Sequence, residues 1–181
     1  MDHGRAPSGK GRELHHINAI DAAQTAGVQH IYYTSLALGS KSKAGVMQAH
    51  LRTEAYLAGL QGINFTVIRE GLYNESWLLY FGFYKLRVDD RHEIVVAGDG
   101  PINWTSLPDL GYVNAVVLAA PSTDYAGRTV TLSTLTGTTL NDLAKSVSNI
   151  RGKDIKLNVV APDEYYRIHT ERGEDEGHVE W

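Results

Sequence analysis

The chain has 181 residues and a formal net charge of -4, with 43% hydrophobic and 21% charged residues, a composition typical of globular proteins. This acidic balance argues against nucleic acid as a partner, because phosphate backbones are bound by clustered basic residues. The absence of cysteine excludes disulfides, thiol catalysis and thiolate metal sites, and no apolar run is long enough to span a bilayer.

The two ends of the sequence are polar. Residues 1–12 are rich in glycine and basic residues and lack the hydrophobic segment of a signal peptide, so we expect a disordered leader and a cytoplasmic protein. Residues 171–181 are acidic and are expected to form a frayed tail. The stretch 13–170 is expected to fold as a single domain, because its length suits one core.

The first half alternates helices with strands. Apolar residues at helical spacing predict helices over Leu14–Ala26 and Gly45–Leu60. The β-branched and aromatic segments His30–Ser35 and Asn64–Arg69 are typical of buried parallel strands. We therefore predict an α/β fold in which these strands are parallel neighbours in a partial Rossmann-type sheet with helices on both faces.

The second half predicts a smaller α/β region on the substrate side. The aromatic segment Glu75–Leu86 could form a helix that lines a pocket, although large rings at helical spacing more often pack in a core. We expect Thr139 to cap the helix that follows it. The other expected elements are strands over 93–97, 102–105, 128–132 and 155–160 and helices over 107–119, 140–149 and 162–170.

Several segments, taken in order, carry a family resemblance. They are NAIDAA at 18–23, AGVQHIYYTS at 26–35, HLRTE at 50–54, GINFTVIREGLYNE at 62–75, GDGPINWTS at 98–106 and DLG at 109–111. Together they resemble the NmrA-like group of atypical short-chain dehydrogenases/reductases, which includes redox-sensing regulators and type 2 quinone oxidoreductases. The resemblance extends from Leu14 to Trp181.

The resemblance implies NADP(H) as cofactor and hydride transfer to a quinone or another small conjugated carbonyl. It also admits a non-catalytic protein that senses NADP and binds a regulatory protein partner. The family's G-x-x-G-x-x-G turn and the Tyr-x-x-x-Lys pair of classical short-chain dehydrogenases do not occur in this sequence. We therefore expect a truncated domain with impaired activity, weak NADPH binding and self-association through an exposed sheet edge.

His50 and Glu54 occupy the helix on which a Tyr-x-x-x-Lys pair would lie. They are four residues apart and share a helix face. One hypothesis makes His50 a catalytic proton relay and Glu54 a cofactor contact, since histidine changes charge near neutral pH. The alternative is an exposed histidine that merely pairs with Glu54.

The remaining candidate residues follow the two predicted strands. Ligand sites of parallel sheets form at the carboxyl ends of the strands, so we expect one cleft there. The cofactor-binding candidates are Thr34, Ser35 and Gly71, with the alternative that Thr34 and Ser35 only form the turn after the strand. Tyr73 is a catalytic candidate, and Tyr73, Asn74 and Trp77 are the substrate-binding candidates. No metal site is expected, because His15 and His16 are adjacent rather than on one helix face.

Overall fold

The computed structural model describes residues 10–37, 39, 41–42 and 44–174. Residues 1–9 of the expected leader and 175–181 of the expected tail lie outside these ranges. The first helix begins at Lys10, so the last three residues of the expected leader are helical. The described chain forms two compact units, the first reaching to Gly71 and including Leu107–Ser133, the second made of Leu72–Ser106 and the residues from Thr134 onward. Residues of the stretch 13–170 contribute to both units, and the single domain stays a prediction.

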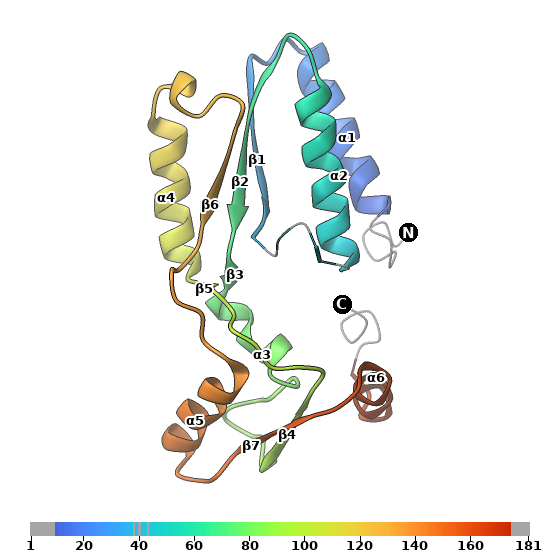
Figure 1. Ribbon diagram of the computed structural model, residues 1–181, viewed down its shortest axis with the longest axis vertical. Helices are drawn as coiled ribbons and strands as arrows, with labels where there is room; N and C mark the ends of the chain where they lie inside the picture. Colours follow the sequence, from blue (N-terminus) through green and yellow to red (C-terminus); the bar gives the residue numbers. More distant parts are fainter. Residues whose placement is uncertain (1–9, 38, 40, 43, 175–181) are drawn as a thin grey trace. The chain divides into compact units, whose positions relative to one another are not determined.

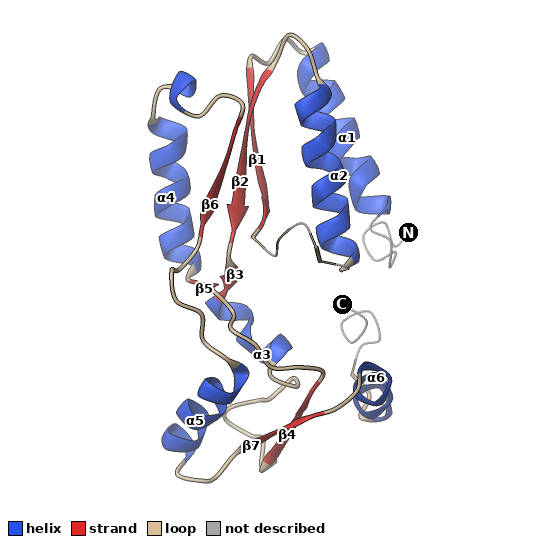
Figure 2. Cartoon of the chain, in the orientation of Figure 1, coloured by secondary structure: helices blue, strands red, loops and turns tan. Residues whose placement is uncertain are grey.

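The first unit is a three-stranded parallel sheet between helices (Figures 1 and 2). The strand order is β1-β2-β6, and the helices lie on both faces of the sheet. Its elements are α1 (Lys10–Thr25), β1 (His30–Leu36), α2 (Gly45–Gly59), β2 (Asn64–Glu70), α4 (Leu107–Ala119), the 3₁₀ helix Ser122–Asp124 and β6 (Arg128–Leu132).

The predicted pairing of the first two strands is confirmed. β1 and β2 are parallel neighbours, with Tyr33 opposite Val67 and Ser35 opposite Arg69. β2 is the central strand, and Thr66, Val67 and Ile68 are each at most 1% exposed, as a strand covered on both faces requires. Alternation along the strands then decides which side chains meet which helices.

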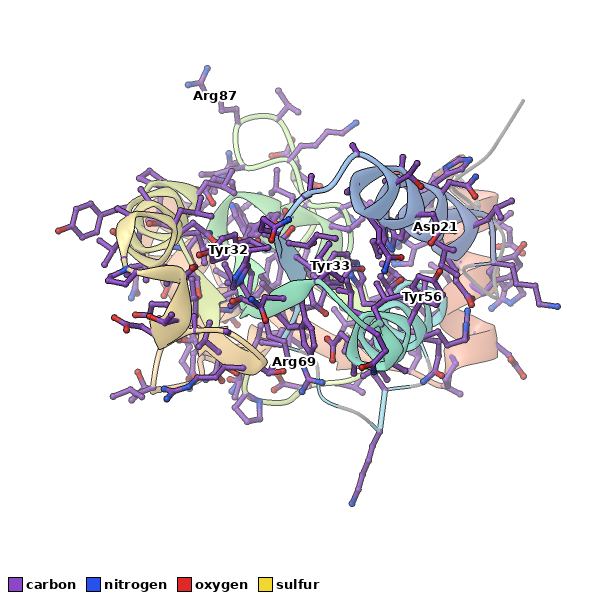
Figure 3. All side chains as sticks on the ribbon, turned by 90° about the horizontal axis from the view of Figure 1, so that it is seen from above. Asp21, Tyr32, Tyr33, Tyr56, Arg69 and Arg87 are labelled. Carbon is purple, nitrogen blue, oxygen red and sulfur yellow. The ribbon has the colours of Figure 1, made fainter. Side chains whose placement is uncertain are left out.

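The two faces of the sheet can be assigned from contacts to the helices. Ser35 and Arg69 bind Glu54 on α2, whereas Glu70 accepts a hydrogen bond of 2.7 Å from the Asn114 amide on α4. Tyr32 and Tyr33 accordingly point to opposite faces of β1 (Figure 3). The odd-numbered residues of β1 therefore face α2, the even-numbered residues the opposite side.

Helix α1 packs on α2 rather than directly into the core. Ile20 is the one side chain of α1 that is buried, whereas α2 buries several, including Met47 and Leu57. The hydroxyl of Tyr56 on α2 donates to the carboxylate of Asp21 on α1, and Figure 3 shows these two side chains between the helices.

The second unit contains two short parallel strand pairs, β3 with β5 and β4 with β7. Its core joins side chains from β4, α5 and the aromatic segment, among them Phe81, Tyr84, Ile94 and Ala144, each at most 1% exposed. The elements are β3 (Leu72–Tyr73), the 3₁₀ helix Asn74–Ser76, α3 (Trp77–Tyr80), β4 (Glu93–Val96), β5 (Trp104–Thr105), α5 (Leu140–Arg151), β7 (Lys156–Val159) and α6 (Pro162–Glu171).

The expected helix over Glu75–Leu86 is wrong beyond one turn. α3 ends at Tyr80, and Gly82 and Phe83 both have positive φ angles, of 56° and 55°. A Cβ atom on Gly82 would lie 2.8 Å from the Val95 carbonyl oxygen, so this left-handed turn lets the chain pass close to β4. The turn carries Phe81 and Tyr84 into the core of this unit.

Three expected strands are shorter than the sequence indicated. The strand expected over 93–97 ends at Val96. The strand expected over 102–105 is regular only at Trp104–Thr105, whereas Ile102 forms an isolated antiparallel bridge with Thr138. The strand expected over 155–160 is regular over Lys156–Val159, and Ile155 belongs to the core.

Helix α5 begins as its sequence predicts. The Thr139 side chain accepts a hydrogen bond of 3.1 Å from the Asp142 backbone N–H, and the Asp142 carboxylate accepts from the Thr139 backbone. This reciprocal arrangement satisfies backbone donors that the first turn of a helix leaves free. Gly152 ends the helix in the left-handed conformation.

Replacing the helix cap should weaken the second unit. We expect Thr139→Ala to lower the free energy of unfolding by about 1 kcal/mol, because the Asp142 N–H loses its acceptor. Thr139→Ser, which keeps the hydroxyl, is the control and should stay within a few tenths of the parent value. Urea unfolding monitored by tryptophan fluorescence measures both, and equal losses in the two variants would contradict the capping role.

Candidate functional site

Ser35, Glu54 and Arg69 form a polar cluster between α2 and the carboxyl ends of β1 and β2. Ser35 is 1% exposed and its hydroxyl donates to Glu54 Oε1 at 2.5 Å. Arg69 donates to the same carboxylate through Nε at 3.1 Å and Nη2 at 2.6 Å. These hydrogen bonds from Arg69 to Glu54 raise the pKa of the guanidinium. The Glu54 side chain is 11% exposed, and its two oxygens are occupied by these charge-assisted hydrogen bonds.

Two of the cofactor-binding candidates, Ser35 and Glu54, therefore touch each other directly. Because Ser35 donates its hydroxyl hydrogen to Glu54 on α2, this hydrogen bond holds the carboxyl end of β1 against the helix. Thr34 is exposed and belongs to the opposite face of the strand. Gly71 is buried and its N–H donates to the Leu132 carbonyl at 2.8 Å. The cofactor-binding role of these four residues stays a prediction.

His50 lies in a second polar cluster, deeper between β1 and α2. It is 9% exposed, and its Nδ1 atom lies 2.6 Å from the Tyr33 hydroxyl. The same hydroxyl lies 3.0 Å from Nδ1 of His16, which in turn lies 3.0 Å from the Thr53 hydroxyl. The alternative of an exposed His50 paired with Glu54 is wrong, because the two side chains take different partners.

The donors and acceptors of this cluster can be assigned by starting from the Thr53 hydroxyl. The Thr53 hydroxyl donates to the Ala49 carbonyl at 2.9 Å, so its oxygen accepts from Nδ1–H of His16. Because Nδ1 of His16 then carries its hydrogen towards Thr53, it cannot accept from Tyr33, and the Tyr33 hydroxyl donates its own proton to Nδ1 of His50. His50 consequently carries its hydrogen on Nε2.

Burial keeps this cluster uncharged near neutral pH. Desolvation, with smaller effects from His16 and Arg12, lowers the pKa of His50 to about 4. Desolvation also lowers the pKa of His16 and raises the pKa of Tyr33 to about 12. A neutral His50 acts through its hydrogen bonds, as acceptor at Nδ1 and donor at Nε2.

The sequence interpretation missed four members of these clusters, Tyr33, His16, Thr53 and Arg69. A signal was present for Tyr33, because alternation places it on the same strand face as Ser35. The place of Arg69 opposite Ser35 depends on the strand register, which the sequence does not show. His16 offered none, since it reaches the cluster through the packing of α1 on α2.

The substrate-binding candidates belong to the second unit. Tyr73 pairs with Thr105 in the β3–β5 ladder, Asn74 is exposed at the start of a 3₁₀ turn and Trp77 is half-buried on α3. Asn74 and Trp77 line one cavity of about 590 Å³. The expected convergence of Tyr73 and Asn74 with Thr34 and Ser35 joins residues of different units and stays a prediction.

Within the described residues, no three histidine or carboxylate side chains gather in a way that could hold a metal ion. None of the helices in those ranges combines the length and apolarity needed to cross a membrane.

Comparison with known proteins identifies clear relatives, although no protein-family model matches the chain. An NmrA-like family domain-containing oxidoreductase of Aspergillus flavus is 32% identical over 153 residues, covering 83% of this chain and 48% of the relative. The chain thus spans about half the length of the curated relative.

Solved structures show the same relationship. The NADPH-dependent quinone oxidoreductase QOR2 of Escherichia coli, complexed with NADPH, superposes with a TM-score of 0.79 and 28% identity, over 93% of this chain and 58% of that one. NmrA, a negative transcriptional regulator solved with NAD, shares the fold with a TM-score of 0.63 and 22% identity, over 83% of this chain and 49% of that one. The chain is a partial homologue of NmrA-like oxidoreductases, and its α/β fold is that of their NAD(P)-binding family, as its sequence predicted.

The buried histidines should make the first unit sensitive to acid. The pKa of His50 is lowered to about 4 in the folded chain from 6.5, so between these pH values the unfolded chain binds more protons. Stability should therefore fall as the pH decreases from 6.5 towards 4. The substitution His50→Asn, whose amide oxygen can still accept from Tyr33, should reduce this slope.

Chemical unfolding at a series of pH values, monitored by circular dichroism, measures the effect. Tyr56→Phe is the control, because it removes an exposed hydrogen bond without changing a group that titrates in this range. A His50→Asn variant with the full slope of the parent would contradict the assignment of a neutral His50.

Proposed function

We propose, from the homology of this chain to NmrA-like oxidoreductases, that it is part of an NAD(P)H-dependent oxidoreductase that transfers hydride to a quinone or another small conjugated carbonyl. The observation that carries the proposal is the extent of the similarity. The match to the A. flavus oxidoreductase and the superposition on the NADPH complex of QOR2 include both the β1–β2 sheet and the second unit. Cytoplasmic location is part of the same proposal.

The residues of the first unit fit one side of a nicotinamide site. The carboxyl ends of β1 and β2 lie level, with Leu36 opposite Glu70, and Thr34 offers an exposed hydroxyl there. Bound NADPH would supply the hydride. Ser35, Glu54 and Arg69 would hold this sheet edge rigid, and Thr34 and Gly71 would contact the cofactor.

The proposed reaction uses two polar side chains. His50 would act as a hydrogen-bond donor through Nε2, in an orientation set by the proton that Tyr33 donates to Nδ1. Tyr73 would contact the substrate together with Asn74 and Trp77, and its hydroxyl would stabilise the oxyanion that forms as a carbonyl accepts hydride.

A second function is favoured by a different observation. α4 exposes Tyr112, Val116 and Leu118, which are 73%, 48% and 54% exposed, and β1 is an edge strand among the described residues. Apolar surface and unpaired strand edges favour binding to protein. A sensor of NADP that binds a regulatory protein, or that self-associates through the β1 edge, would use these surfaces.

Steady-state oxidation of NADPH in the presence of 2-methyl-1,4-naphthoquinone separates the two functions. The oxidoreductase proposal expects slow turnover, with kcat/KM lower than that of E. coli QOR2 in the same assay, and a further loss in Tyr73→Phe. Complete absence of quinone-dependent NADPH oxidation at millimolar NADPH would favour the sensor.

Cofactor affinity of the chain alone should be low. Dinucleotides bind this fold through a glycine-rich turn that docks the pyrophosphate at a helix N-terminus, and this sequence contains no G-x-x-G-x-x-G motif. Calorimetric titration with NADPH should show a dissociation constant weaker than about 100 μM, which corresponds to a binding free energy of about -5.5 kcal/mol.

E. coli QOR2, whose structure contains NADPH, serves as the positive control for this titration. Sedimentation of the same samples reports whether the chain self-associates. Micromolar binding by a folded monomer would overturn the expectation that the chain lacks an essential part of the cofactor site.

A further inference from the structure

The second unit contains a cavity whose lining is sharply divided between floor and rim. Its volume is about 590 Å³, within the range of about 300–1,000 Å³ that small-molecule sites occupy. All residues that line it belong to this unit. The floor is formed by half-buried or buried apolar side chains, namely Trp77, Leu86, Trp104, Leu143 and Val147.

The two indoles of the floor are held in place by other rings. Trp77 packs on Phe81 with ring centroids 5.7 Å apart, and Trp104 meets Tyr80 edge to face at 5.5 Å. Phe81 is fully buried, so the Trp77 indole rests on the core. Flat aromatic surfaces fixed in this way suit stacking on another flat ring.

The rim is polar except for Ile150 and includes three threonines of one loop. Thr134, Thr136, Thr138, Asn74 and Ser146 are all exposed. Thr134 donates its hydroxyl to the Thr136 carbonyl at 3.2 Å, and Ser146 donates to the Asp142 carbonyl at 3.0 Å, so both oxygens remain available as acceptors. The cavity therefore offers hydrogen bonds at its mouth and apolar contact at its base.

The rim loop is anchored on the neighbouring segment 101–103. Thr138 and Ile102 exchange backbone hydrogen bonds of 3.1 and 2.9 Å, and the Asn103 amide donates to the Thr134 carbonyl at 2.6 Å. A Cβ atom on Gly137 would lie 2.6 Å from Cβ of Pro101, which shows how closely the two segments pack. The site is thus formed before any ligand arrives, which lowers the entropic cost of binding.

Charge is absent from the lining. Among the residues that the structure describes, no Asp, Glu, Lys, Arg or His lines this cavity. A charged ligand would lose hydration on the apolar floor without gaining a partner of opposite charge. The lining therefore favours an uncharged occupant.

We infer that this cavity is a binding site for an uncharged, planar ring compound with carbonyl or hydroxyl groups at one edge. The rings lie against Trp77 and Trp104, and the polar edge faces the threonine loop. The inference rests on the proposed function in taking Asn74 and Trp77 as substrate contacts, and it adds the rest of the lining and the restriction to neutral rings.

Intrinsic fluorescence tests the site without cofactor. The chain has three tryptophans, Trp77, Trp104 and Trp181, so in a Trp181→Phe background all indole emission comes from the cavity. Titration with 2-methyl-1,4-naphthoquinone should quench this emission with saturation at micromolar concentrations. The probe forms no thiol adducts, because the chain has no cysteine.

A matched pair of variants locates the binding. Ile150 lines the cavity and is 71% exposed, whereas Val88 is 74% exposed in the same unit and does not line it. In the same background, Ile150→Arg should weaken quinone binding at least tenfold and Val88→Arg should leave it unchanged. Equal affinity in the two variants, or quenching that never saturates, would overturn the site.

A charged probe tests the ligand class. The sulfonate of the same naphthoquinone should bind at least tenfold more weakly than the neutral compound, and equal binding would overturn the restriction to neutral rings.

Saturable quenching without NADPH oxidation would retain the site and contradict the proposed reaction. NADPH oxidation that Ile150→Arg leaves unaltered, without saturable quenching, would retain the reaction and reject the site.

Discussion

The first unit depends on one half-buried carboxylate, that of Glu54. Its two oxygens accept from Ser35 at the end of β1 and from Arg69 at the end of β2, so a single side chain of α2 ties the helix to both strands. Removing one partner should cost less than the roughly 3–5 kcal/mol typical of fully buried ion pairs, because the Arg69 side chain is 26% exposed. The position of α2 and the ends of both strands are therefore coupled through Glu54.

This coupling explains which parts of the site could be predicted from the sequence. Periodicity and strand composition predicted β1, α2 and β2 within one residue at each end, because both signals are local. The spacing of His50 and Glu54 correctly indicated a shared helix face but suggested that the two pair with each other. The partners come from β1 and β2 instead, and strand-to-helix contacts depend on register, which no local pattern reveals.

The second unit shows a different limit on what the sequence can predict. The Thr139 cap was predictable because its partners lie within three residues. The path of the aromatic segment was not, because Phe83 adopts a positive φ angle that a bulky residue rarely takes. Tertiary packing compensates for this local strain by burying Phe81 and Tyr84, so both interpretations of the segment hold in part, with two rings in the core and Trp77 at a cavity.

The two units differ in whether their polar side chains bind one another or stay exposed, and this difference agrees with the chemistry proposed for them. In the first unit hydroxyls, imidazoles and a carboxylate bind one another, which orders them, while burial keeps His50 neutral by lowering its pKa. In the second, apolar rings form a floor while hydroxyls remain at an exposed rim. Hydride transfer to a neutral acceptor calls for both properties, since ordered donors stabilise the charge that develops and a dry ring surface holds the acceptor before any charge exists.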